Sequence, residues 1–269
     1  MTNTTNRARV LGNISSMKKK PYVGVTGFMS SEEVTETLKD IDFKTANRLL
    51  MVGVLASSKT IQGIKNKWPN RYPPLHEIGN IFVKNDDCLN LIHYNTKDPD
   101  KLLTQLIMVS DAVNDNFDGF QLNIAWPPPQ ILENYKSLYP CKQIVLQIGG
   151  GAFEEAGNMP AWVANKVAEY VGIVDYILLD PSGGLGQPSD PLKAREYLDE
   201  LSRYEKEIGL GVAGGLSPNT LHLLEPLLQV YPSISIDAEG KLRNEQDHLD
   251  VAITRKYIQQ SLHMFSMPV

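Results

Sequence analysis

The chain contains few cysteines and no long apolar run, and these shortages argue against a metal site and a membrane span. Its 269 residues include two cysteines, Cys88 and Cys141, which form no CxxC or other metal-like pair. Isolated thiols are typical of a reducing compartment, so we expect free cysteines and a cytoplasmic protein. We expect no zinc site, no other metal and no cofactor. No apolar stretch approaches the roughly 20 residues that cross a bilayer, so we expect no membrane partner.

Positive charge is also in short supply. The formal net charge is -5, which argues against a broad nucleic-acid-binding surface. The cations that stand together, Lys18–Lys20, lie in a polar stretch without the apolar core of a secretory signal. We therefore expect residues 1–20 to form a flexible N-terminal arm. No Ser-, Gly- or Pro-rich linker divides the remainder, so residues 21–269 are predicted to form a single domain.

Short apolar runs alternate with longer amphipathic segments along that domain. Runs without strict alternation suit parallel strands buried on both faces. The eight strand candidates are 22–26, 49–56, 89–94, 119–124, 143–148, 176–180, 209–213 and 233–237. The helix candidates are one capped at Ser30, then 57–67, 98–113, 128–138, 160–171, 191–205, 218–230 and 249–265.

Eight strand–helix pairs in about 250 residues predict a (β/α)8 TIM barrel. The alternative is a doubly wound open sheet, which usually has fewer strands at this length. No GxGxxG motif follows the first strand here, which also disfavours that alternative. The segment 68–87 is too long for a minimal loop. It is interpreted as an ordered excursion, a lid or an interface piece.

In such a barrel the site lies at the carboxyl ends of the strands, and the sixth strand ends at Asp180. A carboxylate there can be partly desolvated, which raises its pKa and suits it to general acid or base catalysis. Alternatively, Asp180 caps the next loop or pairs with a cation. Gly183, Gly184 and Gly186 follow it and would let the backbone approach a ligand, unless they form a plain turn.

The next strand ends at Gly214 and Gly215, shortly before an expected helix start. Bare amides in that place, together with the loop after the eighth strand, form the usual phosphate site of the fold. That last loop contains Glu239, which would repel a phosphate if it pointed inward. Either Glu239 points outward, or the pocket holds a neutral or hydroxylated group. The partner we expect is a small-molecule substrate, either phosphorylated or not.

Other polar residues end the remaining strands. His93 is catalytic or structural, and Asp237 is a second carboxylate candidate. Asn123 and Gln147 are uncharged and would orient a ligand by hydrogen bonds or satisfy loop backbone. Thr26 is a further candidate for substrate binding, and Gln121 is another polar residue near a strand end.

The stretch 174–243 resembles phosphoribosylanthranilate isomerase, a (β/α)8 enzyme of tryptophan biosynthesis. Leu178–Asp180 with the following glycines is similar to that family's sixth strand and its loop, and Val212–Asn219 to its phosphate loop. Ser235–Asp237 with Gly240 resembles its eighth strand, and Val23–Phe28 its first. The resemblance implies a barrel that rearranges a phosphoribosyl amine, with Asp180 as general acid.

Several positions depart from that pattern. Thr26 stands where the family has its catalytic cysteine, and a threonine hydroxyl is too weak an acid to replace a thiolate. Gly24 stands at the lysine position, and Ala238 and Glu239 replace small polar residues that would bind phosphate. The expected arginine after the second strand is absent from Ala56–Lys59. We therefore expect a diverged enzyme and not the tryptophan-pathway isomerase.

Two classes of function remain open. In the first, a barrel enzyme uses Asp180 on a sugar phosphate, nucleotide or other ribosyl compound, by isomerisation or by cleavage of a ribosyl bond. Asp237, Glu239 or His93 would then replace the missing base. In the second, the chain is a non-catalytic binding or regulatory protein on an inactivated scaffold. The sequence leaves the oligomeric state open, a homo-oligomer included.

Overall fold

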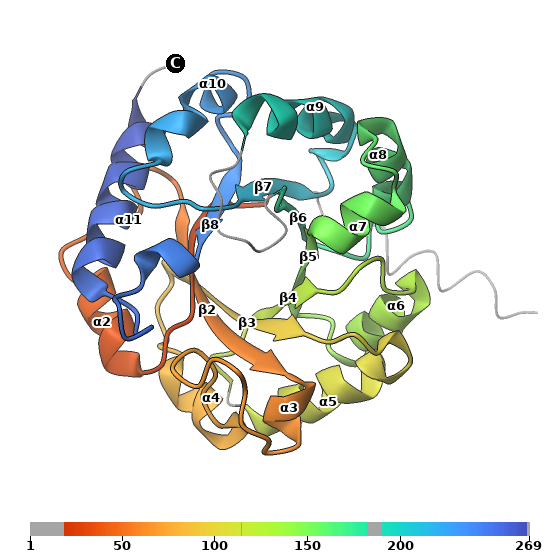
Figure 1. Ribbon diagram of the computed structural model, residues 1–269, viewed down its shortest axis with the longest axis vertical. Coiled ribbons are helices and arrows are strands. Elements are labelled where there is room, and N and C mark those ends of the chain that lie inside the picture. The colour runs from red at the N-terminus through yellow and green to blue at the C-terminus, as the bar shows by residue number, and fades with distance from the viewer. Residues whose placement is uncertain (1–18, 114, 182–189, 268–269) are drawn as a thin grey trace, which may run out of the picture.

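Eight parallel strands close into a barrel in chain order, and helices surround it (Figure 1). The computed structural model describes residues 19–113, 115–181 and 190–267. The first and eighth strands pair, with Val23 opposite Ile236 and Gly24 opposite Asp237. This closure confirms the (β/α)8 prediction, and the alternative of an open doubly wound sheet is wrong.

All eight predicted strands are present, and their ends differ from the prediction by at most two residues. The strands are β1 (Tyr22–Thr26), β2 (Leu49–Ser57), β3 (Cys88–Asn95), β4 (Gly119–Asn123), β5 (Gln143–Ile148), β6 (Tyr176–Leu179), β7 (Gly209–Ala213) and β8 (Ser235–Ala238).

Most predicted helices are also present, and capping residues set several of their starts. Ser30 accepts a hydrogen bond from the Glu33 amide, and Asp190 and Asp250 cap two later helices in the same way. The longer helices are α2 (Ser31–Leu38), α5 (Leu102–Ala112), α6 (Pro129–Leu138), α8 (Pro160–Ala168), α9 (Pro191–Leu201) and α11 (Val251–Ser266).

Two predicted helices are wrong in length. The segment 57–67 contains only α3 (Ser58–Ile61), because Gly63 adopts a φ of +66° and ends the helical path. The segment 218–230 contains a 3-10 helix, η4 (Leu221–Leu224), and the single turn α10 (Glu225–Leu228). Pro226 lies inside this stretch and lacks the amide that would join the two into one regular helix.

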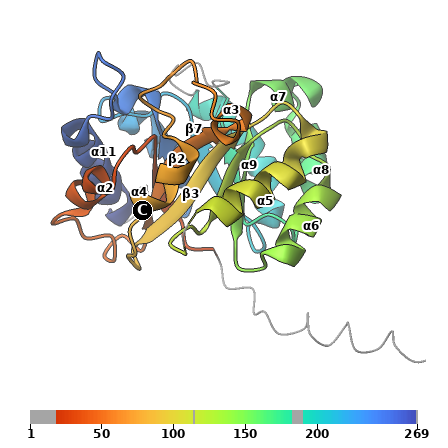
Figure 2. The same cartoon turned by 90° about the horizontal axis from the view of Figure 1, so that it is seen from below.

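Two short helices were not predicted. The segment 68–87 is an ordered excursion that contains α4 (Leu75–Ile81), whose Ile78 and Ile81 are buried. Helix α7 (Gly150–Glu155) follows β5 directly. Helix α7 lies in the β-to-α connection after β5, whereas α4 directly precedes β3 and packs against α2 and α5 in the outer ring (Figure 2).

Apolar side chains form two separate layers. A small cluster fills the inside of the barrel and includes Tyr22, Met51, Leu91 and Tyr176. A much larger cluster lies between the strands and the helices, with Val52, Ile92 and Leu179 among its members. This interior layer lies beneath the carboxyl ends of the strands, the end at which barrels of this fold carry their sites.

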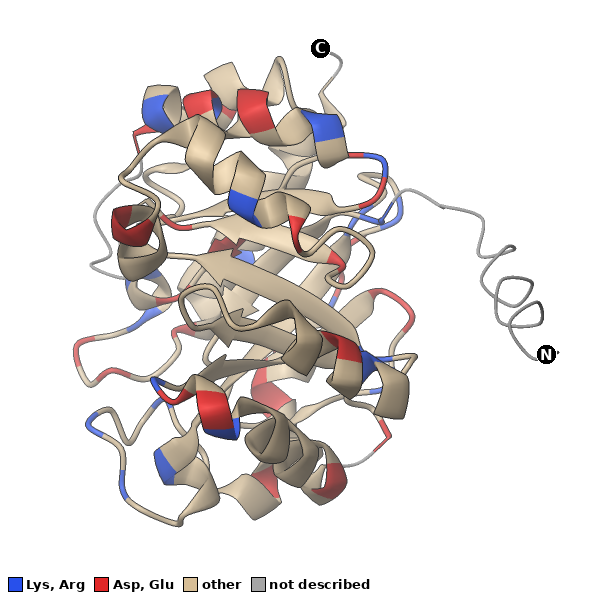
Figure 3. Ribbon diagram, turned by 90° about the vertical axis from the view of Figure 1, so that its right-hand side faces the viewer, with Lys and Arg blue, Asp and Glu red and all other residues tan. Residues whose placement is uncertain are grey.

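The opposite end of the barrel holds the start of the described chain. Lys19 pairs with Asp175, and the Tyr176 hydroxyl donates to the Lys20 carbonyl. The rest of the expected N-terminal arm, residues 1–18, lies outside the described residues. On the side shown in Figure 3, acidic and basic segments are interspersed over helices and loops. Within the described ranges, no helix has the length and apolar character needed to cross a membrane.

Candidate active site

Two adjoining cavities open at the mouth of the barrel and share Gln147 and Asp180. The larger, about 490 Å³, lies beside Asn123 at the end of β4 and the backbone of Gly149–Gly151. The smaller, about 110 Å³, is lined by polar groups from several strands and loops. They include Arg71, His93, Asp180, Gly214, Gly215, Asp237, Glu239 and Lys241.

Asp237 is a deeply buried carboxylate of this mouth, with 6% of its surface exposed. The Thr26 hydroxyl lies 3.1 Å from both carboxylate oxygens, and Gln121 Nε2 donates to Oδ2 at 2.9 Å. Burial raises the pKa of Asp237 to about 7, and the charges of Glu239 and Asp180 act in the same direction. The hydrogen bonds from Gln121 and Thr26 oppose that rise only in part. Asp237 can therefore gain or lose a proton near neutral pH.

Two glycines make room for this carboxylate and its partner. A Cβ atom on Gly24 would lie 2.8 Å from Asp237 Oδ1, and one on Gly53 would lie 2.5 Å from the Thr26 hydroxyl oxygen. Gly24 occupies the position where the resembling family has a lysine. Asp237 fills the space that a side chain at position 24 would need.

Gln121 connects the polar groups of the mouth. Its Nε2 lies 3.0 Å from His93 Nδ1 and 3.2 Å from Gln147 Oε1, in addition to its bond to Asp237. Gln147 Nε2 in turn lies 3.1 Å from Asp180 Oδ2. Two side-chain amides thus link the two carboxylates. A polar residue facing inward on β4 was visible in the sequence, but its role as the hub was not.

His93 lies inside this network and is nearly inaccessible, with 6% of its surface exposed. Burial lowers its pKa, although the negative charges of Glu239 and Asp180 oppose that shift. The imidazole is therefore neutral at neutral pH.

Glu239 points toward the mouth, where Arg71 neutralises it. Arg71 Nη1 donates to Glu239 Oε1 at 2.8 Å, and Arg71 also binds Asp247 through Nε and Nη2. Glu239 therefore does not point outward, and a pocket that holds a neutral or hydroxylated group stays a prediction. An arginine does come from the β2–β3 connection, but from its later part and not from Ala56–Lys59. The length of the 68–87 segment was the signal that could have located it.

A second arginine ties the same loops together. Arg243 Nη2 donates to the Gly27 carbonyl at 3.0 Å, and Nη1 donates to the carbonyls of Asp247 and Asn70. The loops after β1, β2 and β8 are thereby joined at one side of the mouth. Arg243 was not among the residues predicted from the sequence.

Gly214 and Gly215 border the smaller cavity, and both have left-handed backbone, with φ of +115° and +59°. The regular helix expected just beyond them is absent, because the Thr220 hydroxyl closes a turn onto the Gly215 carbonyl. No regular α-helix therefore begins directly after the two glycines, and phosphate binding there stays a prediction. Gly183, Gly184 and Gly186 lie outside the described residues.

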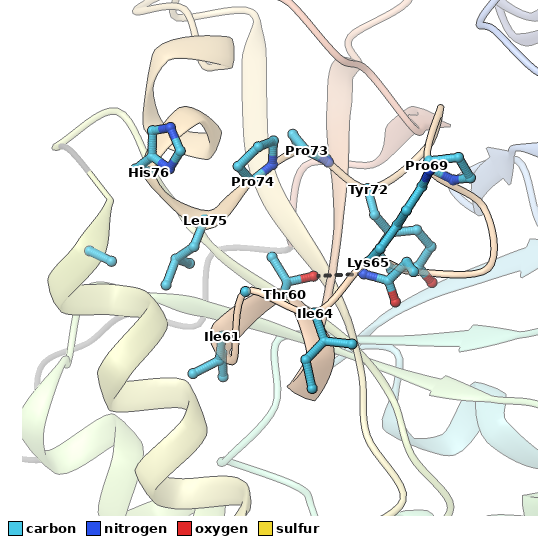
Figure 4. Close-up of a pocket in the computed structure, with 13 residues that line it drawn as sticks. Thr60, Ile61, Ile64, Lys65, Pro69, Tyr72, Pro73, Pro74, Leu75 and His76 are labelled. Carbon is cyan, nitrogen blue, oxygen red and sulfur yellow. Dashed lines mark hydrogen bonds between the residues drawn. The ribbon is translucent and has the colours of Figure 1, made fainter.

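A larger cavity, about 760 Å³, has no lining residue in common with the two cavities of the mouth (Figure 4). Ile61, Ile64 and Leu75 give it largely apolar walls, and an Asn66-to-Thr60 hydrogen bond crosses one side. Tyr72 borders it, and burial raises the pKa of that phenol to about 12. None of the described lining residues is a carboxylate. Volume alone therefore favours this cavity, but acid–base chemistry favours the mouth.

The described side chains do not form a candidate metal site. In residues 19–113, 115–181 and 190–267, no three His, Cys, Asp or Glu residues gather as a metal ion would require. Cys88 and Cys141 are free thiols.

Comparison with known proteins shows the fold alone. No protein-family model and no curated protein matches the chain. Phosphoribosyl anthranilate isomerase from Thermus thermophilus superimposes with a TM-score of 0.57 and 14% identity, covering 89% of this chain and 98% of that one. The isomerase from Thermococcus kodakaraensis gives 0.56 and 16% over 89% and 97%. A chitinase catalytic domain from Pyrococcus furiosus gives 0.53 and 12% over 94% and 99%.

Proposed function

We propose that this chain is a barrel enzyme that acts on a ribosyl compound or sugar phosphate by acid–base catalysis with Asp237 and Asp180. The observation that carries the proposal is Asp237, a buried carboxyl at the barrel mouth whose pKa lies at about 7. A group with that pKa exchanges protons most effectively at neutral pH. Perturbed acids in a cleft are typical of catalytic sites.

Asp237 also supplies what the missing cysteine would have supplied. Thr26 holds the cysteine position and hydrogen-bonds to Asp237 instead of acting as a base. The base thus comes from β8, the barrel neighbour of β1. Asp180 remains as the acid that the resemblance implies, and the Gln121–Gln147 bridge holds the pair in one site.

The lining groups favour a hydroxylated ligand. Asn95, Asn123 and Gln147 offer amide donors and acceptors to the larger cavity, which suits sugar hydroxyls. Lys97 borders that cavity and Lys241 the smaller one, so an anionic group has a cation near it at either end. The names of the superimposable isomerases, which specify a phosphoribosyl compound, agree with this class.

The experiment is a ligand screen followed by turnover measurements. Ribosyl compounds and sugar phosphates are first ranked by thermal shift, and binders are then tested for conversion by NMR. With a converted substrate, Asp237→Asn is expected to lower turnover by about 10²–10⁴-fold, because a general acid or base contributes that much. Asp86→Asn, the same change at an exposed loop position, should leave turnover intact. Full activity of Asp237→Asn would refute the assignment.

The tryptophan-pathway reaction has its own direct test. Expression of this chain in a strain lacking phosphoribosylanthranilate isomerase should give no growth, since the cysteine and lysine positions hold Thr26 and Gly24. Growth would show that the diverged site still performs that rearrangement.

A non-catalytic binding protein is the second candidate, and the observation that favours it is the same loss of the family's base position. It predicts that compounds from the screen bind without conversion. It also predicts that Asp180→Asn leaves their affinity unchanged.

A further inference from the structure

Gln121 lies near more hydrogen-bond acceptors than its amide group has hydrogens to donate. Its Nε2 carries two hydrogens but lies within 3.2 Å of His93 Nδ1, Gln147 Oε1 and Asp237 Oδ2. Its Oε1 is buried and has no hydrogen-bond partner among the described residues. An amide would not leave its acceptor unused unless its surroundings demanded donors.

The neighbours of Gln121 explain that demand. Asp237 lies closest, at 2.9 Å, and an ionised carboxylate only accepts hydrogen bonds. Gln147 directs its own nitrogen to Asp180, so its oxygen is left to face Gln121. Turning the Gln121 amide over would place its oxygen against both of these oxygens. The two carboxylates therefore fix the orientation of both amides.

The orientation of Gln121 then fixes the state of His93. Nδ1 of a neutral imidazole that faces an N–H donor must be the unprotonated nitrogen, so the proton lies on Nε2. Burial keeps the ring neutral by lowering its pKa. His93 also lines the smaller cavity together with Asp237 and Glu239.

We infer that Gln121 is a positioning residue that holds His93 as the neutral Nε2–H tautomer, so that His93 donates a hydrogen bond to a ligand oxygen in the smaller cavity. Carbonyl, hydroxyl and phosphate oxygens are the ligand atoms that fit such a donor. Proton removal then falls to the carboxylates and not to His93. The inference rests on the proposed function, because it takes the smaller cavity to be part of the active site.

The charges around the imidazole define what a variant should do. Glu239 and Asp180 already favour protonation of His93, and Arg71 partly neutralises Glu239. Asp237 adds a further carboxyl that shares Gln121 with His93. A carboxylate in place of the Gln121 amide would replace the donor to Nδ1 with an acceptor. The imidazole proton should then move to Nδ1, and the His93 pKa should rise.

Long-range proton–nitrogen NMR of the ¹⁵N-labelled protein at pH 8 tests this directly. Wild-type His93, assigned by its loss in His93→Gln, should show a protonated Nε2 and a bare Nδ1. The four other histidines are exposed and provide internal references. Gln121→Glu should shift the Nδ1 resonance to that of a protonated nitrogen. Gln130→Glu, the same change on the exposed face of α6, should leave His93 unaltered.

A second variant keeps the test decisive if Gln121→Glu does not fold. Gln121→Met removes the donor without adding charge, and both tautomers of His93 should then appear. A protonated Nδ1 in the wild-type protein, or an unchanged His93 in the folded variants, would overturn the inference. These spectra need no substrate, so the tautomer assignment can fail while the proposed catalysis stands, and the reverse also holds.

Discussion

Asp175 and Asp237 are equally buried, each with 6% of its surface exposed, but they lie at opposite ends of the barrel in opposite surroundings. Asp175 precedes β6 at the lower end. There it pairs with Lys19 at 2.5 Å and Lys136 at 3.1 Å and accepts the Ile144 amide at 2.8 Å. Asp237 has no ion pair among the described residues, and its hydrogen bonds come from the uncharged Thr26 and Gln121.

The contrast separates the roles of the two ends. Ion pairs and hydrogen bonds offset the hydration that a buried charge loses, so the charged form of Asp175 can serve as part of the scaffold. Asp237 is buried without a cation beside it among the described residues, so burial disfavours its charged form and raises its pKa to about 7. The lower end thus uses its carboxylate to hold the chain together, whereas the mouth keeps one in a state that can exchange protons.

The same substitution at both positions should give opposite results. Asp175→Asn leaves Lys19 and Lys136 without their counter-charge and loses the charge-assisted bond from Ile144. We expect the free energy of unfolding to fall by about 2–4 kcal/mol, measured by urea denaturation at pH 7.5. A loss below about 0.5 kcal/mol would mean that the compensated carboxylate is dispensable and would remove the contrast.

Asp237→Asn should instead stabilise the protein, and this effect should be seen only at pH values above about 4. The pKa of Asp237 is about 7 when folded but about 3.9 in an unfolded chain, so the folded state binds the extra proton between these values. The stabilisation from the protonated carboxyl is complete below about pH 4 and is lost as the pH rises through about 7. Asn mimics the neutral acid and avoids this loss.

We therefore expect the free energy of unfolding of Asp237→Asn to exceed that of wild type by about 4 kcal/mol at pH 8 and to match it near pH 4. Urea denaturation across that range measures the difference. A difference that does not change with pH would show that the carboxyl titrates normally despite its burial.

Arg71 offers the test with the smallest expected effect on stability, and it pairs with Glu239, a carboxylate of the mouth. Its partners Glu239 and Asp247 are partly exposed, so Arg71→Gln should cost no more than about 1 kcal/mol of stability. Its local effect should be clearer, as faster hydrogen exchange in residues 239–250. Arg195→Gln, at an exposed pair on α9, is the matched control. Equal exchange in both variants would mean that Arg71 does not hold the loops of the mouth.

The sequence predicted the strand ends that carry the site better than it predicted the contacts between their side chains. Strand ends such as Asp180, Asp237 and Gln147 were recognisable because each terminates an apolar run, and parallel strands bring such ends to one face. Arg71 was not predicted as a site residue, because it lies in a loop and no hydrophobic periodicity indicates where its side chain points. Gln121 was recognised as polar, but its contacts depend on the register between β3, β4 and β5.

By itself, the sequence determined the barrel and the face that carries its polar groups, because apolar periodicity and strand count are local properties of the chain. Only the tertiary structure decided that Asp237 is buried without a cation and that Asp175 is buried with two. Burial and charge compensation arise from residues far apart in the chain. Two aspartates that look alike in the sequence therefore acquire different proton affinities only when the barrel closes.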